Sequence, residues 1–132
     1  RLSHYNPFEL VTLPDVKQGH KLAPDQLMAK EAEMVLGKLQ PNDMLVLLDE
    51  RGQQYSSRQF ARQLERWLQR PVRRIVFLVA GAWGAAPELK LRADVQLSLS
   101  QMTFSHQMVR LFLAEQLYRA FTILRGEPYH ND

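Results

Sequence analysis

The side chain in this sequence with the clearest capacity for chemistry is Arg110, which lies in a segment expected to form a helix over residues 107–124. That helix is apolar around nearly all of its circumference, and Arg110 projects almost opposite the polar strip that contains Glu115 and Arg119. A guanidinium on a buried face needs a carboxylate partner or an anionic ligand. A structural ion pair and an anion-binding or RNA-binding site are therefore both open interpretations.

A second basic feature is a run of arginines at four-residue spacing, in and just after an expected helix over residues 56–69: Arg58, Arg62, Arg66 and Arg70. A solvated helix surface is the ordinary interpretation of such a stripe, and contact with phosphates is the alternative.

The sequence has no cysteine, which excludes disulfides and thiolate metal sites. No metal site is expected either, because the histidines do not stand at metal-ligand spacings: His4, His20, His106 and His130.

Composition limits the class of protein. With 132 residues and 45% hydrophobic content, the chain is expected to form one globular domain over residues 1–132. The formal net charge of +3 permits a nucleic-acid partner without requiring one. The longest uncharged central stretch, residues 75–86, is too short to span a bilayer, and the lack of cysteine is compatible with a cytoplasmic location. Because the first residue is Arg1 rather than Met, we expect that residues precede it.

Apolar runs typical of strands alternate with helical patterns along the chain. Strands are expected at residues 8–13, 44–48, 74–79 and 95–99, and helices at 25–39, 56–69, 107–124 and in a short segment that ends near residue 93. This alternation predicts an α/β fold with a mostly parallel sheet flanked by helices. In such folds ligands gather at the carboxyl ends of the strands, where we expect the loops 49–52, 80–84 and 100–106 to meet. Glycines in two of these loops would let a ligand approach the backbone, but no loop matches a Rossmann or P-loop pattern.

Two of the expected helices carry further local signals. Ser56 and Gln59 form a plausible capping box for the helix 56–69, whose inward-facing residues are expected to be Phe60, Leu64, Trp67 and Leu68. The helix 107–124 is expected to end at Gly126, a natural C-cap. Because this last helix is apolar on two sides, we predict that one face lies in the domain core and another in a subunit interface.

Four motifs together carry a resemblance to a known family. The chain contains, in order, LLDERG, FLVAGAWG, LSLSQMTFSHQMVR and LAEQLYRAFTILRGEPYH. In these motifs it resembles the ribosomal RNA large subunit methyltransferase H family, the pseudouridine N3-methyltransferases of the SPOUT class. The similarity covers the chain from Arg1 to its end, and its most specific part is residues 103–130.

The resemblance implies a SPOUT-type fold whose C-terminal segment forms a trefoil knot, an exception to the usual unknotted chain. It implies a homodimer that binds S-adenosylmethionine in the knot and methylates N3 of a pseudouridine in 23S rRNA within the assembled ribosome. The family also has a first strand and most of a first helix before the position of Arg1, so this chain is expected to lack them.

The resemblance further implies a cofactor site made largely by backbone groups. The positions that match the family's cofactor contacts are Leu48, Ala80, Gly81, Leu99, Ser100, Gln101, Met102, Thr103 and Phe104. Simple core packing is the alternative for Leu48 and Leu99. Where the family usually reads Gly-Gly-Pro-x-Gly, residues 80–84 of this chain read Ala-Gly-Ala-Trp-Gly, so the methyl group of Ala80 is expected to affect cofactor affinity.

On the substrate side we hypothesise a group made of His106, Arg110, Tyr129 and His130, the last two reaching the partner subunit's pocket. His130 is a candidate base or base contact, and Arg110 a candidate to stabilise the anionic imide or hold a phosphate. The alternative for His130 is a frayed, solvated chain end. Two other functions remain open: a non-catalytic RNA-binding dimer with an impaired cofactor site, and a small-molecule-binding module without an RNA partner.

Overall fold

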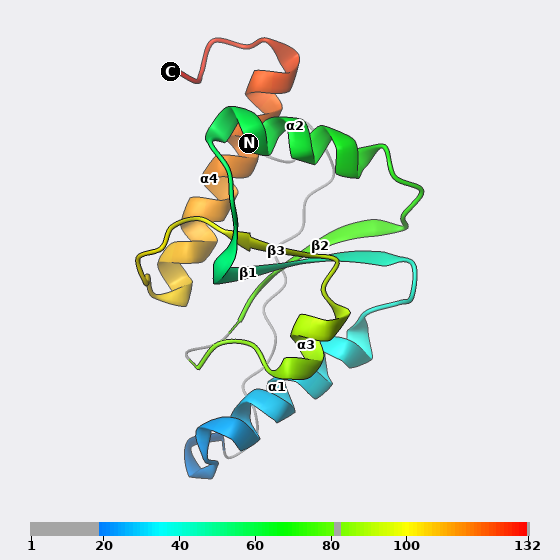
Figure 1. Cartoon of the computed structure of the whole chain (residues 1–132), viewed down its shortest axis with the longest axis vertical. Coiled ribbons are helices and arrows are strands. Elements are labelled where there is room, and N and C mark those ends of the chain that lie inside the picture. Colours follow the sequence, from blue (N-terminus) through cyan, green and yellow to red (C-terminus); the bar gives the residue numbers. More distant parts are fainter. Residues whose placement is uncertain (1–18, 81–82, 132) are drawn as a thin grey trace.

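Three parallel strands form the centre of the structure, a computed structural model that describes residues 19–80 and 83–131 (Figure 1). Strand β1 (Asp43–Gln54) lies between β2 (Arg74–Val79) and β3 (Val95–Ser98), and both pairs are parallel. The strand expected at residues 8–13 and the start of the loop after it lie outside the described residues. The expectation of an α/β fold with a parallel sheet is confirmed.

Helices cover both faces of this sheet (Figure 1). Helix α1 (Pro24–Lys38), preceded by the 3-10 turn η2 (Gly19–Lys21), and helix α3 (Pro87–Arg92) pack on one face. Helices α2 (Ser57–Leu68) and α4 (His106–Arg125) pack on the other. Among the described residues no helix is long and apolar enough to cross a membrane.

The core follows the two-residue period of β1, which is buried on both faces. Met44, Val46 and Leu48 point toward α2 and α4, whereas Leu47 points toward α1 and α3. All four side chains are less than 10% exposed, as expected for an apolar strand covered from both sides.

The local signals at the helix ends are also confirmed, with one exception. The hydroxyl of Ser56 accepts from the N–H of Gln59, whose side chain accepts from the N–H of Ser56. Gly126 caps α4 at a φ of 69°. The expectation that Leu68 faces inward is wrong, since it is 45% exposed. Side chains four residues apart on a helix point in directions that differ by about 40° around its axis. Leu68 comes eight residues after the buried Phe60, so its side chain points about 80° away from that of Phe60 and out of the core.

The amino-terminal edge of the sheet is closed by charged residues that we call the amino-end cluster: Asp43, Arg73, Arg74, Arg92 and Asp94. The buried carboxylate of Asp43 pairs with Arg73 at 3.1 Å and with Arg74 at 3.0 Å, and it accepts the Gln40 N–H. Burial alone would raise its pKa, but these hydrogen bonds hold the pKa of Asp43 below its usual value. Arg92 joins the cluster by donating to Asp94 and to the Asp43 carbonyl.

Candidate functional site

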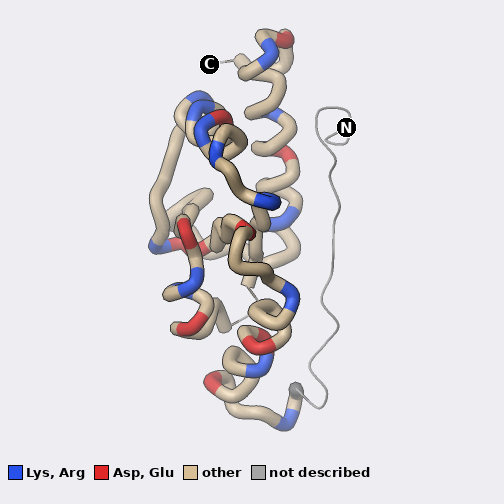
Figure 2. Tube along the Cα trace, turned by 90° about the vertical axis from the view of Figure 1, so that its right-hand side faces the viewer, with Lys and Arg blue, Asp and Glu red and all other residues tan. Residues whose placement is uncertain are grey.

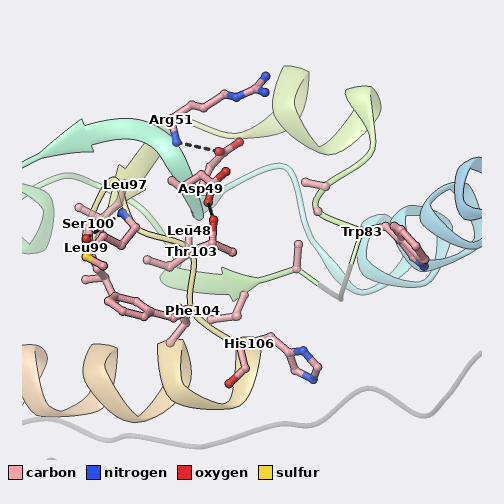
Figure 3. Close-up of a pocket in the computed structure, with 18 of the residues that line it drawn as sticks. Leu48, Asp49, Arg51, Trp83, Leu97, Leu99, Ser100, Thr103, Phe104 and His106 are labelled. Atoms are coloured by element: carbon pink, nitrogen blue, oxygen red, sulfur yellow. Dashed lines mark hydrogen bonds between the residues drawn. The ribbon is translucent and has the colours of Figure 1, made fainter.

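The carboxyl end of β1 leaves the regular ladder. Leu48 and Gln53 both pair with Leu97 of β3, so residues 49–52 form a bulge between them. These residues were expected to form a loop after the strand, but the structure continues β1 through them. The bulge places Asp49, Glu50 and Arg51 at this end of the sheet, and in Figure 3 the Arg51 side chain extends away from the other labelled residues.

Gly52 makes this bulge possible. A Cβ atom at this position would lie 2.6 Å from the carbonyl carbon and oxygen of Gln96, and both are backbone atoms of β3. Glycine is therefore required here by the close approach of another strand. The expectation that a glycine of this loop admits a ligand is wrong for Gly52, which does not line the adjacent cavity.

A cavity of about 710 Å³ opens at the carboxyl ends of the three strands (Figure 3). All three segments that the sequence predicted to meet there line it. Residues 49–51 come from the bulge, residues 80, 83 and 84 from the loop after β2, and residues 99, 100 and 102–106 from the loop after β3 and the start of α4. A volume of this size suits a ligand as large as a nucleoside derivative.

The cavity has an apolar side and a charged side. Leu48, Val79, Leu97, Leu99 and Val109 supply apolar lining from the strand ends and α4. On the charged side the ammonium of Lys90 lies 3.8 Å from the carboxylate of Asp49. A cation with an apolar body would therefore find both solvation by carboxylate and apolar contact in this space.

The loop after β3 is fastened to the bulge through hydroxyl groups. Thr103 Oγ1 donates to Glu50 Oε2 at 2.6 Å, and Ser98 Oγ donates to the carbonyls of Glu50 and Ser100. The Ser100 hydroxyl in turn accepts from the N–H of Met102 at 3.0 Å. These bonds hold the irregular backbone of residues 99–104 against the end of the sheet.

Most of the positions predicted for a cofactor lie around this cavity: Leu48, Ala80, Leu99, Ser100, Met102, Thr103 and Phe104. Gln101 does not line it, and Gly81 lies outside the described residues. The sequence placed the loop 49–52 at this edge but did not assign Asp49, Glu50 or Arg51 to the cofactor, and it missed Lys90. The Asp-Glu-Arg run after a buried strand was a usable signal for the first three, whereas nothing local singled out Lys90.

The first turn of α4 brings His106 to the cavity (Figure 3). Burial raises the pKa of Glu31 on α1, and the electrostatic effect of His106 lowers it by a smaller amount, so the pKa of Glu31 is raised overall. Arg110, one turn further along, is half-buried and does not line the cavity. Among residues 19–80 and 83–131 it forms no hydrogen bond or ion pair, so the structural ion pair considered for it has no counterpart there.

The chain end after α4 folds back onto the helix. Glu115 Oε1 accepts from Arg119 Nη2 at 2.6 Å and from the Tyr129 hydroxyl at 3.2 Å. Arg119 lies 4.9 Å from the centre of the Tyr129 ring, and its Nη1 is 3.0 Å from His130 Nδ1. The pKa of Arg119 is raised by the hydrogen bond to Glu115, although burial opposes this. The interpretation of His130 as a frayed, solvated end is therefore wrong.

The four residues predicted for the substrate side are not one cluster within a single chain. His106 is the first residue of α4, and Tyr129 and His130 follow its last turn. The chain end contacts Glu115 and Arg119, which come nine and 13 residues after His106, so the two groups lie roughly 14–20 Å apart along the helix axis. Sequence reasoning missed Glu115 and Arg119 as the anchor of the chain end, although their four-residue spacing favours an ion pair on a helix.

Apolar side chains remain exposed where α4 begins. We call this set the apolar patch: Met102, Phe104, Met108, Leu111 and Phe112. Leu111 is 61% exposed, and the rings of Phe104 and Phe112 pack edge to face with centres 5.3 Å apart. Contiguous exposed apolar surface of this kind is typical of an interface.

Comparison with known proteins gives one consistent result. The sequence model of the family described as "Predicted SPOUT methyltransferase" matches residues 1–130. A protein of Christiangramia forsetii is 48% identical over 131 residues, which is 99% of this chain and 83% of the relative. Proteins of Parabacteroides distasonis and Porphyromonas gingivalis are each 48% identical over 132 residues, 100% of this chain and 84% of the relative. All three relatives are named ribosomal RNA large subunit methyltransferase H.

Proposed function

The chain belongs to the SPOUT methyltransferase family, and we propose that it methylates N3 of a pseudouridine in 23S rRNA of the assembled ribosome, with S-adenosylmethionine as donor. The observation that carries the proposal is the cavity at the carboxyl ends of the strands, which is lined by three of the four motifs that resemble the family. The names of relatives at 48% identity support the ribosomal substrate. The proposed location is the cytoplasm, where ribosomes are found.

The lining of the cavity fits the proposed cofactor. S-adenosylmethionine supplies an electrophilic methyl group on a sulfonium, so its site must accept an apolar nucleoside and a positive charge. Leu48, Leu97 and Leu99 offer apolar contact, and the carboxylates of Asp49 and Glu50 offer complementary charge. Ala80 and the backbone of residues 99, 100 and 102–104 would hold the cofactor.

On the substrate side the chain must bind the base and favour the anionic form of its weakly acidic imide. Arg110 is suited to this, because its guanidinium is permanently charged and lacks an ion-pair partner among the described residues. A positive charge beside the imide lowers the cost of losing the N3 proton, and that is the step in which the protein can assist most. His106 lies at the cavity and would contact the base or its ribose.

The proposed role of His130 follows from its contact with Arg119. An arginine N–H can only donate, so His130 Nδ1 accepts and the ring proton lies on Nε2. An imidazole Nε2–H is a donor group that suits a carbonyl oxygen of the base. We therefore assign His130 to binding and polarising the base, with Tyr129 packed on Arg119 to hold it in place.

The distance along α4 between His106 and His130 supports a composite site in a homodimer. In this arrangement the chain end of one subunit would complete the cavity of its partner. The apolar patch, which includes the 61%-exposed Leu111, is the surface proposed for this contact.

Transfer of labelled methyl from S-adenosylmethionine to ribosomes that lack the modification tests the activity. Label is expected at N3 of the pseudouridine with the wild-type chain. His130→Ala should lower kcat by about 100-fold, because a donor to the developing anion is lost. The matched control is His20→Ala, an exposed histidine before α1 that should change nothing. Ribosome binding without transfer would instead favour a non-catalytic RNA-binding protein.

The dimer is tested by Leu111→Asp, which places a charge in the apolar patch. We expect a monomer by light scattering and loss of methyl transfer, with helical content retained. Transfer at the wild-type rate by a monomeric variant would contradict the composite site.

A further inference from the structure

The outward surface of α2 and the turn after it carries a charged feature that the proposed catalytic site does not use. We call it the arginine face: Arg58, Arg62, Arg66 and Arg70, all of them exposed. Figure 2 shows these basic positions gathered on the α2 segment, near the end of α4. Glu65 is the acidic residue of this helix.

The packing of α2 fixes the direction in which this face points. Phe60, Ala61, Leu64 and Trp67 are buried on the opposite side, against the sheet and α4. From Arg58 to Arg66 the helix rises about 12 Å, and the three helical arginines span an arc of about 80°. The three helical arginine positions therefore lie on the outward-facing side of a packed helix.

Two of the four arginines lack a hydrogen-bond or ion-pair partner within the described chain. Arg62 and Arg66 form no hydrogen bond or ion pair with any described residue, and Arg70 makes only a long contact, 3.7 Å, to the sulfur of Met44. Like charges at four-residue spacing destabilise a helix. Oppositely charged pairs occur on other helices, where Arg119 pairs with Glu115 on α4 and Lys30 with Glu33 on α1.

The arginine face also lies beside the proposed substrate side. Helix α2 packs on α4, and Ser57 Oγ donates to Gln116 Oε1 at 2.9 Å. The neighbouring Glu115 holds Tyr129 and, through Arg119, His130. The first turn of α2, where the arginine face begins with Arg58, therefore lies beside the helix that holds the chain end.

We propose that the arginine face binds the phosphate backbone of the RNA next to the target nucleotide. This inference rests on the proposed function and adds the surface that holds the substrate outside the cavity. Guanidinium groups bind phosphate through paired N–H donors, and a row of them neutralises several phosphates without reading sequence. The face thus supplies affinity and salt dependence, whereas the cavity supplies the methyl transfer.

The test compares two double variants that remove the same charge. Arg62→Gln with Arg66→Gln changes the face, and Lys30→Gln with Lys38→Gln changes exposed lysines of α1. Binding to ribosomes lacking the modification is measured over a range of KCl concentrations, together with kcat, KM and calorimetric binding of S-adenosylmethionine. Melting temperatures verify that both variants fold.

We expect the arginine variant to bind about tenfold more weakly and to reduce the slope of log K against log salt by about 1.5–2. Its KM should rise while kcat and cofactor binding stay within about twofold of wild type. The lysine variant should keep the wild-type slope. Equal slopes for wild type and the arginine variant would overturn the proposal.

Two further outcomes separate this inference from the proposed function. In the first outcome the wild-type chain binds ribosomes with a steep salt dependence, the arginine variant loses this dependence, and neither protein transfers methyl. This result would support the arginine face as an RNA-binding surface and contradict the proposed methyltransferase activity. If affinity falls for ribosomes but is unchanged for protein-free 23S rRNA, the partner is an acidic protein surface and the RNA assignment is overturned.

Discussion

The two edges of the central sheet are built in opposite ways. At the amino-terminal edge Asp43 is buried and hydrogen-bonded from several sides, and the charges of the amino-end cluster are paired with one another. At the carboxyl-terminal edge β1 bulges, carboxylates face a cavity of about 710 Å³, and the closest ion pair across it is 3.8 Å long. Charges at the first edge are used to stabilise the fold, whereas charges at the second are left available to a ligand.

The largest effect is expected where the bulge meets β3. Gly52→Ala should lower the free energy of unfolding by about 3 kcal/mol, because its Cβ would meet backbone atoms that cannot move aside. Urea denaturation measures this. Gly37→Ala on α1 is the control: nothing lies within 4 Å, so it should stabilise the protein by about 0.5–1 kcal/mol. An unchanged urea midpoint for Gly52→Ala would show that the bulge is not tight.

A charge removed from each edge tests the contrast directly. Asp43→Asn should lower the free energy of unfolding by about 2 kcal/mol, since two guanidinium partners lose their carboxylate. Asp49→Asn at the other edge should change it by less than about 0.5 kcal/mol. Comparable losses in urea denaturation would remove the distinction between the edges.

The pH dependence of the same pair has a definite sign. The pKa of Asp43 is lower in the folded state, so its contribution to stability is present above its ordinary pKa near 4 and is lost as the pH falls through the lowered value. Wild type should therefore lose more stability than Asp43→Asn when acidified below about pH 4. Parallel acid unfolding curves would contradict this.

A smaller effect is expected from the hydrogen bond that joins the bulge to the loop after β3. Thr103→Val removes the hydroxyl that donates to Glu50, and it should weaken S-adenosylmethionine binding about fivefold, equivalent to about 1 kcal/mol. Calorimetry gives the affinity, and thermal unfolding should stay within about 2 °C of wild type. Thr103→Ser keeps the hydroxyl and should bind normally. If both variants bind alike, the hydrogen bond does not order the loop.

The smallest effect concerns Glu31, which faces the start of α4. Because burial raises the pKa of Glu31, the folded state is penalised once the pH rises above the ordinary value for a glutamate and the group must ionise. Glu31→Gln should thus stabilise the protein at pH 7 by less than about 1 kcal/mol and have no such benefit at pH 4. The exposed Glu33→Gln is the control and should show no gain at either pH.

Much of the fold was predictable because its signals are local. The apolar run 44–48, the capping box at Ser56 and the C-cap at Gly126 each depend on neighbours within a few residues. The exposure of Leu68 was not predictable in this way, since it depends on where the helix passes the edge of its contact with the core. The bulge was missed for the same kind of reason: residues 49–52 are polar, and their pairing is set by β3, more than 40 residues later.

The candidate site likewise has features that could be predicted from local sequence and features that could not. Which segments would meet could be predicted from the sequence, because the carboxyl ends of parallel strands share one edge of the sheet. His106 and most of the loop 99–104 were also expected at this edge. That Lys90 belongs to the cavity and that Gly52 is required by a neighbouring strand became visible in the folded structure. It alone showed that His130 is held by Arg119, because contacts between distant residues depend on packing, which no local pattern encodes.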